Sequence, residues 1–205
     1  MANERIITIA RQFGSGGREI GEALAKALGV KCYDKELISL AAKKSGVDPE
    51  IFNNVDEKAT NSLLYSLSLG LYSFGNNYSA DNLPVNDKLY LLQHKIIKEL
   101  ANKGPCVIVG RCADYVLREK KNLVRLFICA DMDYRIDRAV KLKDIKKSKA
   151  AQTISKTDKS RANYYNFYSG MKWGEPENYD LSVNRTKLST EQVVGVVLGY
   201  LKATQ

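Results

Sequence analysis

A glycine-rich segment near the amino terminus combines the residue types that can bind phosphate. It directly follows the apolar run at 6–10 and precedes a helical pattern of apolar residues at 20, 24 and 28. Glycines leave consecutive backbone N–H groups free to converge on phosphate oxygens, and the start of the following helix adds a favourable dipole. We therefore predict an anion-binding loop made by Gly14, Ser15, Gly16, Gly17 and Arg18.

This loop departs from the phosphate-loop pattern GxxxxGK[ST]. The pattern would require glycine at Arg11, lysine at Gly17, and serine or threonine at Arg18. Of its fixed positions only Gly16 fits. A dinucleotide-binding loop is a second interpretation, although the glycines that continue to Gly21 lack the final spacing of GxGxxG. A tight turn without a ligand is the third.

A second group of residues follows the apolar run CVIVG at 106–110. It consists of Gly110, Arg111 and Asp114. Ligands of parallel sheets bind beyond the carboxyl ends of the strands, so Arg111 would lie beside the glycine loop if the two strands are neighbours. A guanidinium group can bind phosphate through two parallel N–H bonds. The alternative is that Arg111 and Asp114 pair with each other.

A third group of charged residues follows the run LVRLFIC at 123–129. Arg135 and Arg138 are one helical turn apart, and Asp158 and Arg161 lie further along the chain. These four residues indicate a second anionic pocket, with surface ion pairs as the alternative.

Apolar runs that alternate with helical patterns indicate what must position these groups. Strands are expected at 6–10, 30–33, 106–110, 123–129 and 179–184, and helices at 18–28, 35–45, 87–102, from 131, and 190–202. Such alternation predicts an α/β fold with a parallel sheet covered by helices on both faces. Two stretches interrupt it: a long insert between 49 and 84, and a basic segment at 141–161.

Composition excludes several classes of protein. A length of 205 residues favours a single domain. The formal charge of +9 favours anionic partners. Four cysteines without a CxxC pair and a single histidine, His94, leave no ligand set for zinc. Because reduced thiols suit the cytosol and no stretch resembles a signal peptide or a membrane span, we expect a cytoplasmic protein that does not enter a membrane.

The order of these motifs resembles that of cytidylate kinases. The matching parts are ITIARQFGSGGREIGEALAKALG, the pair Tyr33 and Asp34, CVIVGR, ADMDYRIDR, and the DxxR spacing of Asp158 and Arg161. The motifs GSGGREIG and GRCAD are similar to those of the cytidylate kinase-like family, a divergent branch of the P-loop nucleoside monophosphate kinases. The resemblance spans nearly the whole chain.

This resemblance implies a three-layer P-loop fold with a five-stranded parallel sheet. It divides the single domain of 1–205 into a core (1–34, 87–140 and 162–205), a helical insert that binds a nucleoside monophosphate (35–86) and a basic lid (141–161). Residues 14–18 would bind the donor phosphates, with Arg135 and Arg138 facing the donor. Binding of the acceptor would fall to Asp34, Arg111, Asp114, Asp158 and Arg161.

The function implied is ATP-dependent phosphate transfer with Mg²⁺ to a small acceptor, CMP or dCMP being the first to test. Because the magnesium-binding hydroxyl is replaced by Arg18, the ion would need another ligand, for which Ser15, Glu19 and Asp114 are candidates. We expect Arg18 to replace the missing lysine, so that Arg18, Arg135 and Arg138 are the catalytic residues.

Two other functions stay open. A nucleotide-binding or regulatory protein could keep this fold without catalysis, and a nucleic-acid binder could use the basic segment together with Tyr164, Tyr165 and Tyr168, although helix packing explains these tyrosines better. The apolar run at 63–72 could pack within the insert or form a homodimer contact.

Overall fold

Five parallel strands form the single sheet in the part of the chain that the structure describes. The computed structural model describes residues 4–34 and 85–204, so the predicted helix at 35–45 and most of the insert lie outside the described residues. The strands are β1 Ile6–Arg11, β2 Lys31–Tyr33, β3 Cys106–Val109, β4 Leu123–Cys129 and β5 Leu181–Asn184. Their order is β2-β3-β1-β4-β5, with every neighbouring pair parallel. All five predicted strands are confirmed.

Four of the five predicted helices are present in the described residues, together with two helices that were not predicted. They are α1 Gly17–Leu28, α5 Val85–Asn102, α6 Ala113–Val116, α7 Met132–Lys143, α8 Lys147–Ser169 and α9 Thr190–Ala203, with a short 3₁₀ helix η3 at Pro176–Asn178. Helix α5 begins two residues before its predicted start at 87. The basic segment at 141–161 is not a separate unit of secondary structure, because it spans the end of α7 and most of α8.

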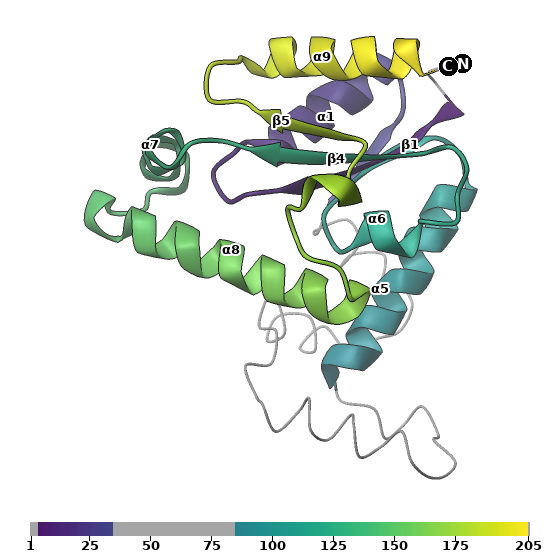
Figure 1. The fold of residues 1–205 in the computed structure, drawn as a ribbon, viewed down its shortest axis with the longest axis horizontal. Helices are drawn as coiled ribbons and strands as arrows, with labels where there is room; N and C mark the ends of the chain where they lie inside the picture. The colour runs from purple at the N-terminus through teal and green to yellow at the C-terminus, as the bar shows by residue number, and fades with distance from the viewer. Residues whose placement is uncertain (1–3, 35–84, 205) are drawn as a thin grey trace.

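The helices cover both faces of the sheet, as predicted (Figure 1). On one face α1 and α9 pack together over strand residues such as Ile7 and Leu126, which are fully buried. On the other face α5 and α6 bury a second cluster that includes Ile97 and Ile108. The strands are apolar on both sides because helices exclude water from both faces.

Local signals fix where some helices begin and end. Helix α9 starts with a capping box, in which the Ser189 hydroxyl accepts from the Gln192 amide and the Gln192 side chain accepts from the Ser189 amide. Helix α1 ends at Gly29, which takes the left-handed conformation common at helix ends.

Helices α7 and α8 lie beyond the carboxyl end of β4, with the long α8 running beneath the sheet toward α5 (Figure 1). The tyrosines of α8 pack rather than form an open stacking platform. The ring of Tyr168 stacks on Tyr90 at 3.9 Å between centroids, and Tyr164 meets Tyr168 edge to face at 4.8 Å. Within the described ranges, none of the helices is both long enough and apolar enough to cross a bilayer.

Candidate phosphoryl-transfer site

The predicted glycine loop joins the end of β1 to the start of α1. Gly14 and Gly16 have φ of 79° and 77°, a left-handed conformation that side chains disfavour. A Cβ on Gly14 would lie 2.9 Å from the carbonyl oxygen of Arg135. The buried Ser15 hydroxyl lies within hydrogen-bond distance of two carbonyl oxygens that share its one hydrogen, those of Gln12 at 2.9 Å and Ile128 at 3.1 Å. The loop is thus held against β4 in a conformation that its glycines permit.

The backbone of this loop has unused hydrogen-bond donors. Gly16 caps α1 and Gly17 is its first residue. The first amides of a helix have no partner inside the helix, and they carry its partial positive charge. Among residues 4–34 and 85–204, the amides of Gly14, Gly16 and Gly17 donate to no carbonyl or side chain. This arrangement can accept an anion such as a phosphate group.

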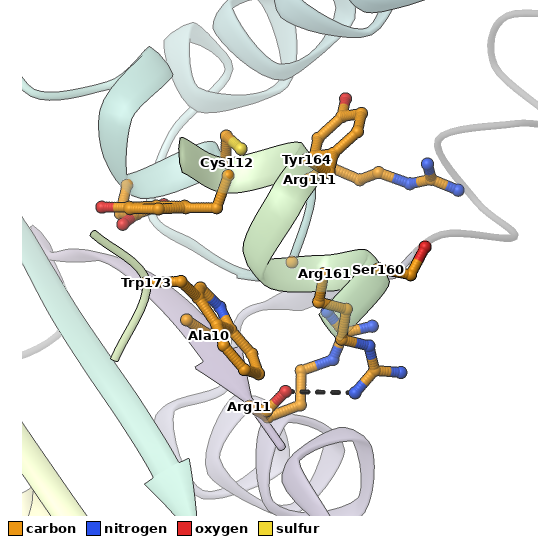
Figure 2. A pocket seen from close by; sticks show the side chains of 11 residues that line it. Ala10, Arg11, Arg111, Cys112, Ser160, Arg161, Tyr164 and Trp173 are labelled. Atoms are coloured by element: carbon orange, nitrogen blue, oxygen red, sulfur yellow. Dashed lines mark hydrogen bonds between the residues drawn. The ribbon is translucent and has the colours of Figure 1, made fainter. Parts of the chain in front are cut away.

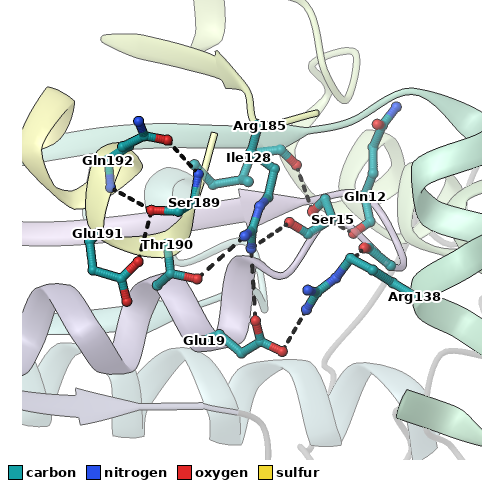
Figure 3. A network of polar contacts seen from close by, with 11 residues as sticks. Gln12, Ser15, Glu19, Ile128, Arg138, Arg185, Ser189, Thr190, Glu191 and Gln192 are labelled. Carbon is teal, nitrogen blue, oxygen red and sulfur yellow. Dashed lines mark hydrogen bonds and ion pairs between the residues drawn. The ribbon is translucent and has the colours of Figure 1, made fainter. Parts of the chain in front are cut away.

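Two arginines from distant elements reach the loop (Figure 3). Arg138 of α7 donates from Nε to the Gly14 carbonyl at 3.1 Å and from Nη2 to Glu19 at 2.5 Å. Arg185, which follows β5, places Nη1 3.5 Å from the Ser15 carbonyl and 3.8 Å from the second Glu19 oxygen. A Cβ on Gly16 would overlap Arg185 Nη1, so a side chain at this position would displace the guanidinium group from the loop.

Arg185 is a residue that the sequence analysis missed. Its side chain is only 4% exposed, and the buried guanidinium donates through Nη2 to the Thr190 hydroxyl. Within the described structure its Nε has no hydrogen-bond partner. The available signal was a basic residue directly after a predicted strand, the same signal that identified Arg111.

The predicted residues Arg135 and Asp158 hold the loop from outside. Arg135 Nη1 pairs with Asp158 Oδ2 at 2.5 Å, and Asp158 Oδ1 accepts from the Phe13 amide at 2.7 Å. Both side chains are largely buried, and neither lines either of the two cavities at this edge of the sheet. In this structure the pair connects α7 and α8 to the glycine loop. Their predicted roles toward donor and acceptor stay predictions.

The loop lines one side of a cavity of about 470 Å³. The structure brings together glycines and charged side chains around this cavity. The predicted site residues among them are Gly14, Gly16, Gly17, Arg18, Glu19, Asp34, Arg138 and Arg161, and Arg11 and Lys143 also line the cavity. The surplus of arginine and lysine over acidic residues favours an anionic ligand. The volume is in the range of small-molecule sites.

Arg18 lies at the rim of this cavity. Its Nε is 3.0 Å from both Glu22 Oε1 and Asp34 Oδ2, and its side chain is 51% exposed. Asp34, which the sequence assigns to the acceptor, therefore pairs with the arginine that the sequence assigns to catalysis. Both roles stay predictions.

The end of β3 has an unusual backbone. Three successive residues, Gly110, Arg111 and Cys112, have φ of 82°, 61° and 52°. Left-handed conformation costs roughly 1–2 kcal/mol for a residue with a side chain. Such strain persists where the surrounding structure enforces it, and it is concentrated at functional sites. Strands β1 and β3 pair directly, as the placement of Arg111 beside the glycine loop required.

Asp114 lies just beyond this turn in α6 and is buried. Burial raises the pKa of its carboxyl group, an effect that the nearby Tyr165 hydroxyl and backbone amides offset only in part. In the described part of the chain, Asp114 Oδ2 has no hydrogen-bond partner. A buried carboxyl group without full pairing is a common mark of a functional site.

Arg111 and Asp114 line a second, smaller cavity of about 50 Å³ (Figure 2). Tyr164, Tyr165 and Trp173 contribute aromatic walls. Burial raises the pKa of Tyr164 and Tyr165, so both phenols stay protonated and can donate hydrogen bonds. Two residues, Arg11 and Arg161, line both cavities, and Arg161 Nη1 donates to the Arg11 carbonyl at 3.1 Å.

The three predicted magnesium ligands are not brought into one set. The Ser15 hydroxyl is committed to two carbonyls, Glu19 pairs with Arg138, and Asp114 lines the smaller cavity. Across the described residues, no three His, Cys, Asp or Glu side chains converge on a metal position. These residues do not fit a magnesium ion held by the protein alone.

The fold, with its glycine loop between β1 and α1, is the fold of P-loop kinases. Among solved structures, a shikimate kinase from Acinetobacter baumannii in complex with shikimate is 14% identical, covering 100% of this chain and 97% of its own, with a TM-score of 0.55. A gluconokinase from Sinorhizobium meliloti is 16% identical over 98% and 93% of the two chains, with a TM-score of 0.54. At these identities the likeness concerns the fold.

The sequence identifies the branch within this class. Residues 6–187 match the cytidylate kinase-like family, and the chain belongs to that family. An uncharacterized protein from Eubacterium ventriosum is 26% identical over 97% of this chain and 98% of its own, with a TM-score of 0.73. The resemblance inferred from the motifs is thus confirmed.

One curated relative has a different name. A uronate isomerase from Corynebacterium glutamicum is 24% identical over 144 residues, which is 70% of this chain. The matched part spans only 28% of that protein's length.

Proposed function

We propose that this protein is an ATP-dependent phosphotransferase of the nucleoside monophosphate kinase type. The observation that carries the proposal is the pair of adjoining cavities, one bounded by the glycine loop and the other by the end of β3, with Arg11 and Arg161 in both. A donor and an acceptor bound on either side of these guanidinium groups would bring their phosphates together between them. Membership of the cytidylate kinase-like family supports the same reaction.

The larger cavity is the proposed donor site. The amides of the glycine loop would bind phosphate oxygens, and Arg138 and Arg185 are close enough to the loop to add positive charge. Glu19 now pairs with both arginines, and phosphate oxygens would compete with it for them. Magnesium would enter with the nucleotide, because ions of this kind are bound by phosphates and water with few protein ligands.

The smaller cavity, which shares Arg11 and Arg161 with the donor cavity, is the proposed site for part of the acceptor, because its volume of about 50 Å³ is too small for a whole nucleotide. Arg111 and Arg161 are the predicted ligands of the acceptor phosphate, and Asp114 with the tyrosine hydroxyls can form hydrogen bonds to the rest of the molecule. CMP or dCMP is the first acceptor proposed, on the basis of the family.

The reaction needs little covalent assistance from the protein. An acceptor phosphate oxygen forms a bond to the γ-phosphorus of ATP, the bond from that phosphorus to the bridging oxygen breaks, and its electron pair stays on ADP. An ionised acceptor phosphate has no proton to lose, whereas a hydroxyl acceptor has to transfer one to a base or to water. Catalysis then depends on alignment and on cations that stabilise the charge of the transferred group.

A nucleotide-binding protein without catalysis is the second candidate. The observation that favours it is Gly17, which leaves the usual lysine position without a side chain, while Arg18 is paired with Glu22 and Asp34. A cytoplasmic location is proposed for either function.

A panel assay tests the two candidates. The protein is incubated with ATP, magnesium and each of CMP, dCMP, other nucleoside monophosphates and small hydroxylated acceptors, and ADP and the phosphorylated product are both quantified. Product formation with a member of the panel supports the transferase. Binding of ATP in a titration without any product contradicts the transferase and supports the regulator.

A further inference from the structure

Positions 11 and 17 of this chain have the reverse of the residues in the phosphate-loop pattern, with the basic side chain at 11 and the glycine at 17. GxxxxGK[ST] has glycine where this chain has Arg11, and lysine where it has Gly17. In that pattern the lysine side chain reaches the terminal phosphates of the nucleotide. The loop therefore lacks a cation at one of these two positions and has an additional one at the other.

The structure shows that the two changes compensate in space. A Cβ on Gly17 would lie 2.6 Å from Arg11 Cβ and 2.8 Å from Arg11 Cγ. Contacts this short do not occur between real side chains, so a side chain at position 17 is excluded while Arg11 keeps its place. The stem of Arg11 thus passes through the space where a lysine at 17 would begin.

A second glycine makes room for the other end of the same side chain. A Cβ on Gly110 would overlap Arg11 Nη1 and lie 2.9 Å from Arg11 Cζ. Gly110 belongs to the turn after β3, whereas Gly17 begins α1. Two glycines from separate elements therefore define the path of Arg11 from the end of β1 across to the end of β3.

This path brings the guanidinium group to the junction of the two cavities. Figure 2 shows Arg11 and Arg161 together at one end of the smaller pocket. Arg11 also lines the larger cavity together with Gly14, Gly16 and Gly17. A cation at this junction is placed for a phosphate group that moves from one cavity to the other.

Arg18 has a different environment. Its Nε lies between the carboxylates of Glu22 and Asp34, and its side chain is half exposed at the cavity rim. To reach a phosphate group bound at the loop amides, the Arg18 side chain would have to leave these carboxylates.

We propose that Arg11 supplies, from the end of β1, the positive charge that lysine supplies from position 17 of the phosphate-loop pattern, by contacting the terminal phosphate of the donor. The inference rests on the proposed function, which makes the larger cavity the donor site. It assigns Arg11 as a catalytic residue and gives Gly17 the role of leaving its path open.

Titration with ATP compares three variants that each remove one positive charge. Arg11→Met is expected to raise the ATP Kd roughly tenfold to a hundredfold, the range for lost hydrogen bonds to a charged group. The control Lys26→Met, at an exposed position at the far end of α1, is expected to stay within about threefold of the wild type. Arg18→Met, at the rim of the donor cavity, is expected to lose less ATP affinity than Arg11→Met. Under the transferase assay, Arg11→Met is expected to lower the rate by roughly 10³-fold.

A rescue experiment separates a moved charge from a damaged fold. Arg11→Gly combined with Gly17→Lys restores two fixed positions of the GxxxxGK pattern. The double variant is expected to bind ATP with a lower Kd than Arg11→Gly alone, and so to recover part of the lost affinity. Gly17→Lys alone is expected to bind worse than the double variant, because its side chain meets Arg11. Thermal unfolding of each variant shows whether binding is lost without unfolding.

Unchanged ATP binding in Arg11→Met, or a loss in Arg18→Met as large as in Arg11→Met, overturns the assignment. So does a folded double variant that recovers nothing. Failure of the proposed function looks different. A wild-type protein that binds ATP through Arg11 and forms no product refutes the transferase, and still supports Arg11 as the ligand of the terminal phosphate.

Discussion

The ends of the neighbouring strands β1 and β3 hold charge in different ways. After β1, Arg138 and Arg185 are already paired with Glu19, whose side chain is 46% exposed. After β3, Asp114 is buried, and its Oδ2 lacks a hydrogen-bond partner among the described residues. At the first end the partly exposed Glu19 carboxylate can give way to another anion as the partner of these arginines. At the second end a carboxyl group is kept desolvated before any ligand binds.

The backbones of the two ends differ in the same sense. In the loop after β1, the left-handed positions are occupied by glycine, at Gly14 and Gly16. In the turn after β3, two of the three left-handed residues, Arg111 and Cys112, carry side chains. We infer that the first end is built without strain around a ligand-sized space, whereas the second stores strain and desolvation to fix a few groups in place.

The largest effect is expected from closing the unstrained end. Gly16→Ala would add both a left-handed alanine and an overlap with the buried Arg185. It is expected to destabilise the protein by about 3 kcal/mol and to abolish ATP binding. Gly29→Ala is the matched control, because Gly29 has a φ of 68° with nothing within 4 Å of its Cβ position, and it should lose only about 1 kcal/mol. Equal losses of stability in Gly16→Ala and Gly29→Ala, measured by denaturant unfolding, would show that the overlap with Arg185 costs no stability.

At the strained end, removing the buried charge should stabilise the protein. Because burial raises the pKa of Asp114 above its ordinary value of 3.8, the folded state keeps a proton that the unfolded state releases. Stability contributed by this group is thus present below about pH 4 and is lost as the pH rises through the folded pKa. Asp114→Asn should raise the unfolding free energy by about 1 kcal/mol at pH 7 and weaken acceptor binding.

Unfolding temperatures measured from pH 4 to pH 8 test this prediction, with the exposed Asp137→Asn as control. The wild type and the control should lose stability relative to Asp114→Asn as the pH rises. A constant difference across this range would mean that Asp114 does not titrate as its burial implies.

Backbone strain at the same end predicts a smaller difference between two variants of Arg111. Arg111→Ala and Arg111→Gly both remove the guanidinium group, but only glycine accepts a φ of 61° without strain. The glycine variant should be more stable by about 1 kcal/mol, while both weaken binding of the acceptor equally. Chemical denaturation gives the first quantity and acceptor titration the second. Equal stabilities would show that the turn relaxes when the side chain is removed.

The smallest effect is expected where the charges can already exchange. Glu19→Gln removes the carboxylate that competes with phosphate for Arg138 and Arg185. Because Glu19 is partly exposed, its ion pairs are screened, and the ATP affinity should rise only about twofold to fivefold. The gain should diminish as salt is added. A lower affinity in ATP titrations would identify Glu19 as a ligand of the nucleotide or its metal ion.

The fold was predictable because its signals are local. Apolar runs such as those at 106–110 and 123–129 are buried on both faces of a parallel sheet, and the capping box at Ser189 fixes the start of α9. Part of the site follows from the same signals. Once β1 and β3 are strands, the glycine loop and Arg111 must lie at the same edge of the sheet.

Pairings between distant side chains could not be predicted in this way. Arg185 reaches Ser15 across 170 positions of the sequence, and Arg138 reaches Gly14 across 124. Nothing near either arginine in the sequence specifies its partner, because a long side chain can reach several elements, and packing selects among them.

The sequence by itself determined a parallel α/β sheet with a glycine loop after its first strand, in a chain that has more basic than acidic residues. Only the tertiary structure decided which of those residues occupies the vacant lysine position. Arg18 is next to that position in the sequence, yet it turns toward Glu22 and Asp34, whereas Arg11 lies six positions earlier and fills the space beside Gly17. The physical reason is steric: two glycines on different elements leave a path that one side chain can follow, and the sequence does not show that they face each other.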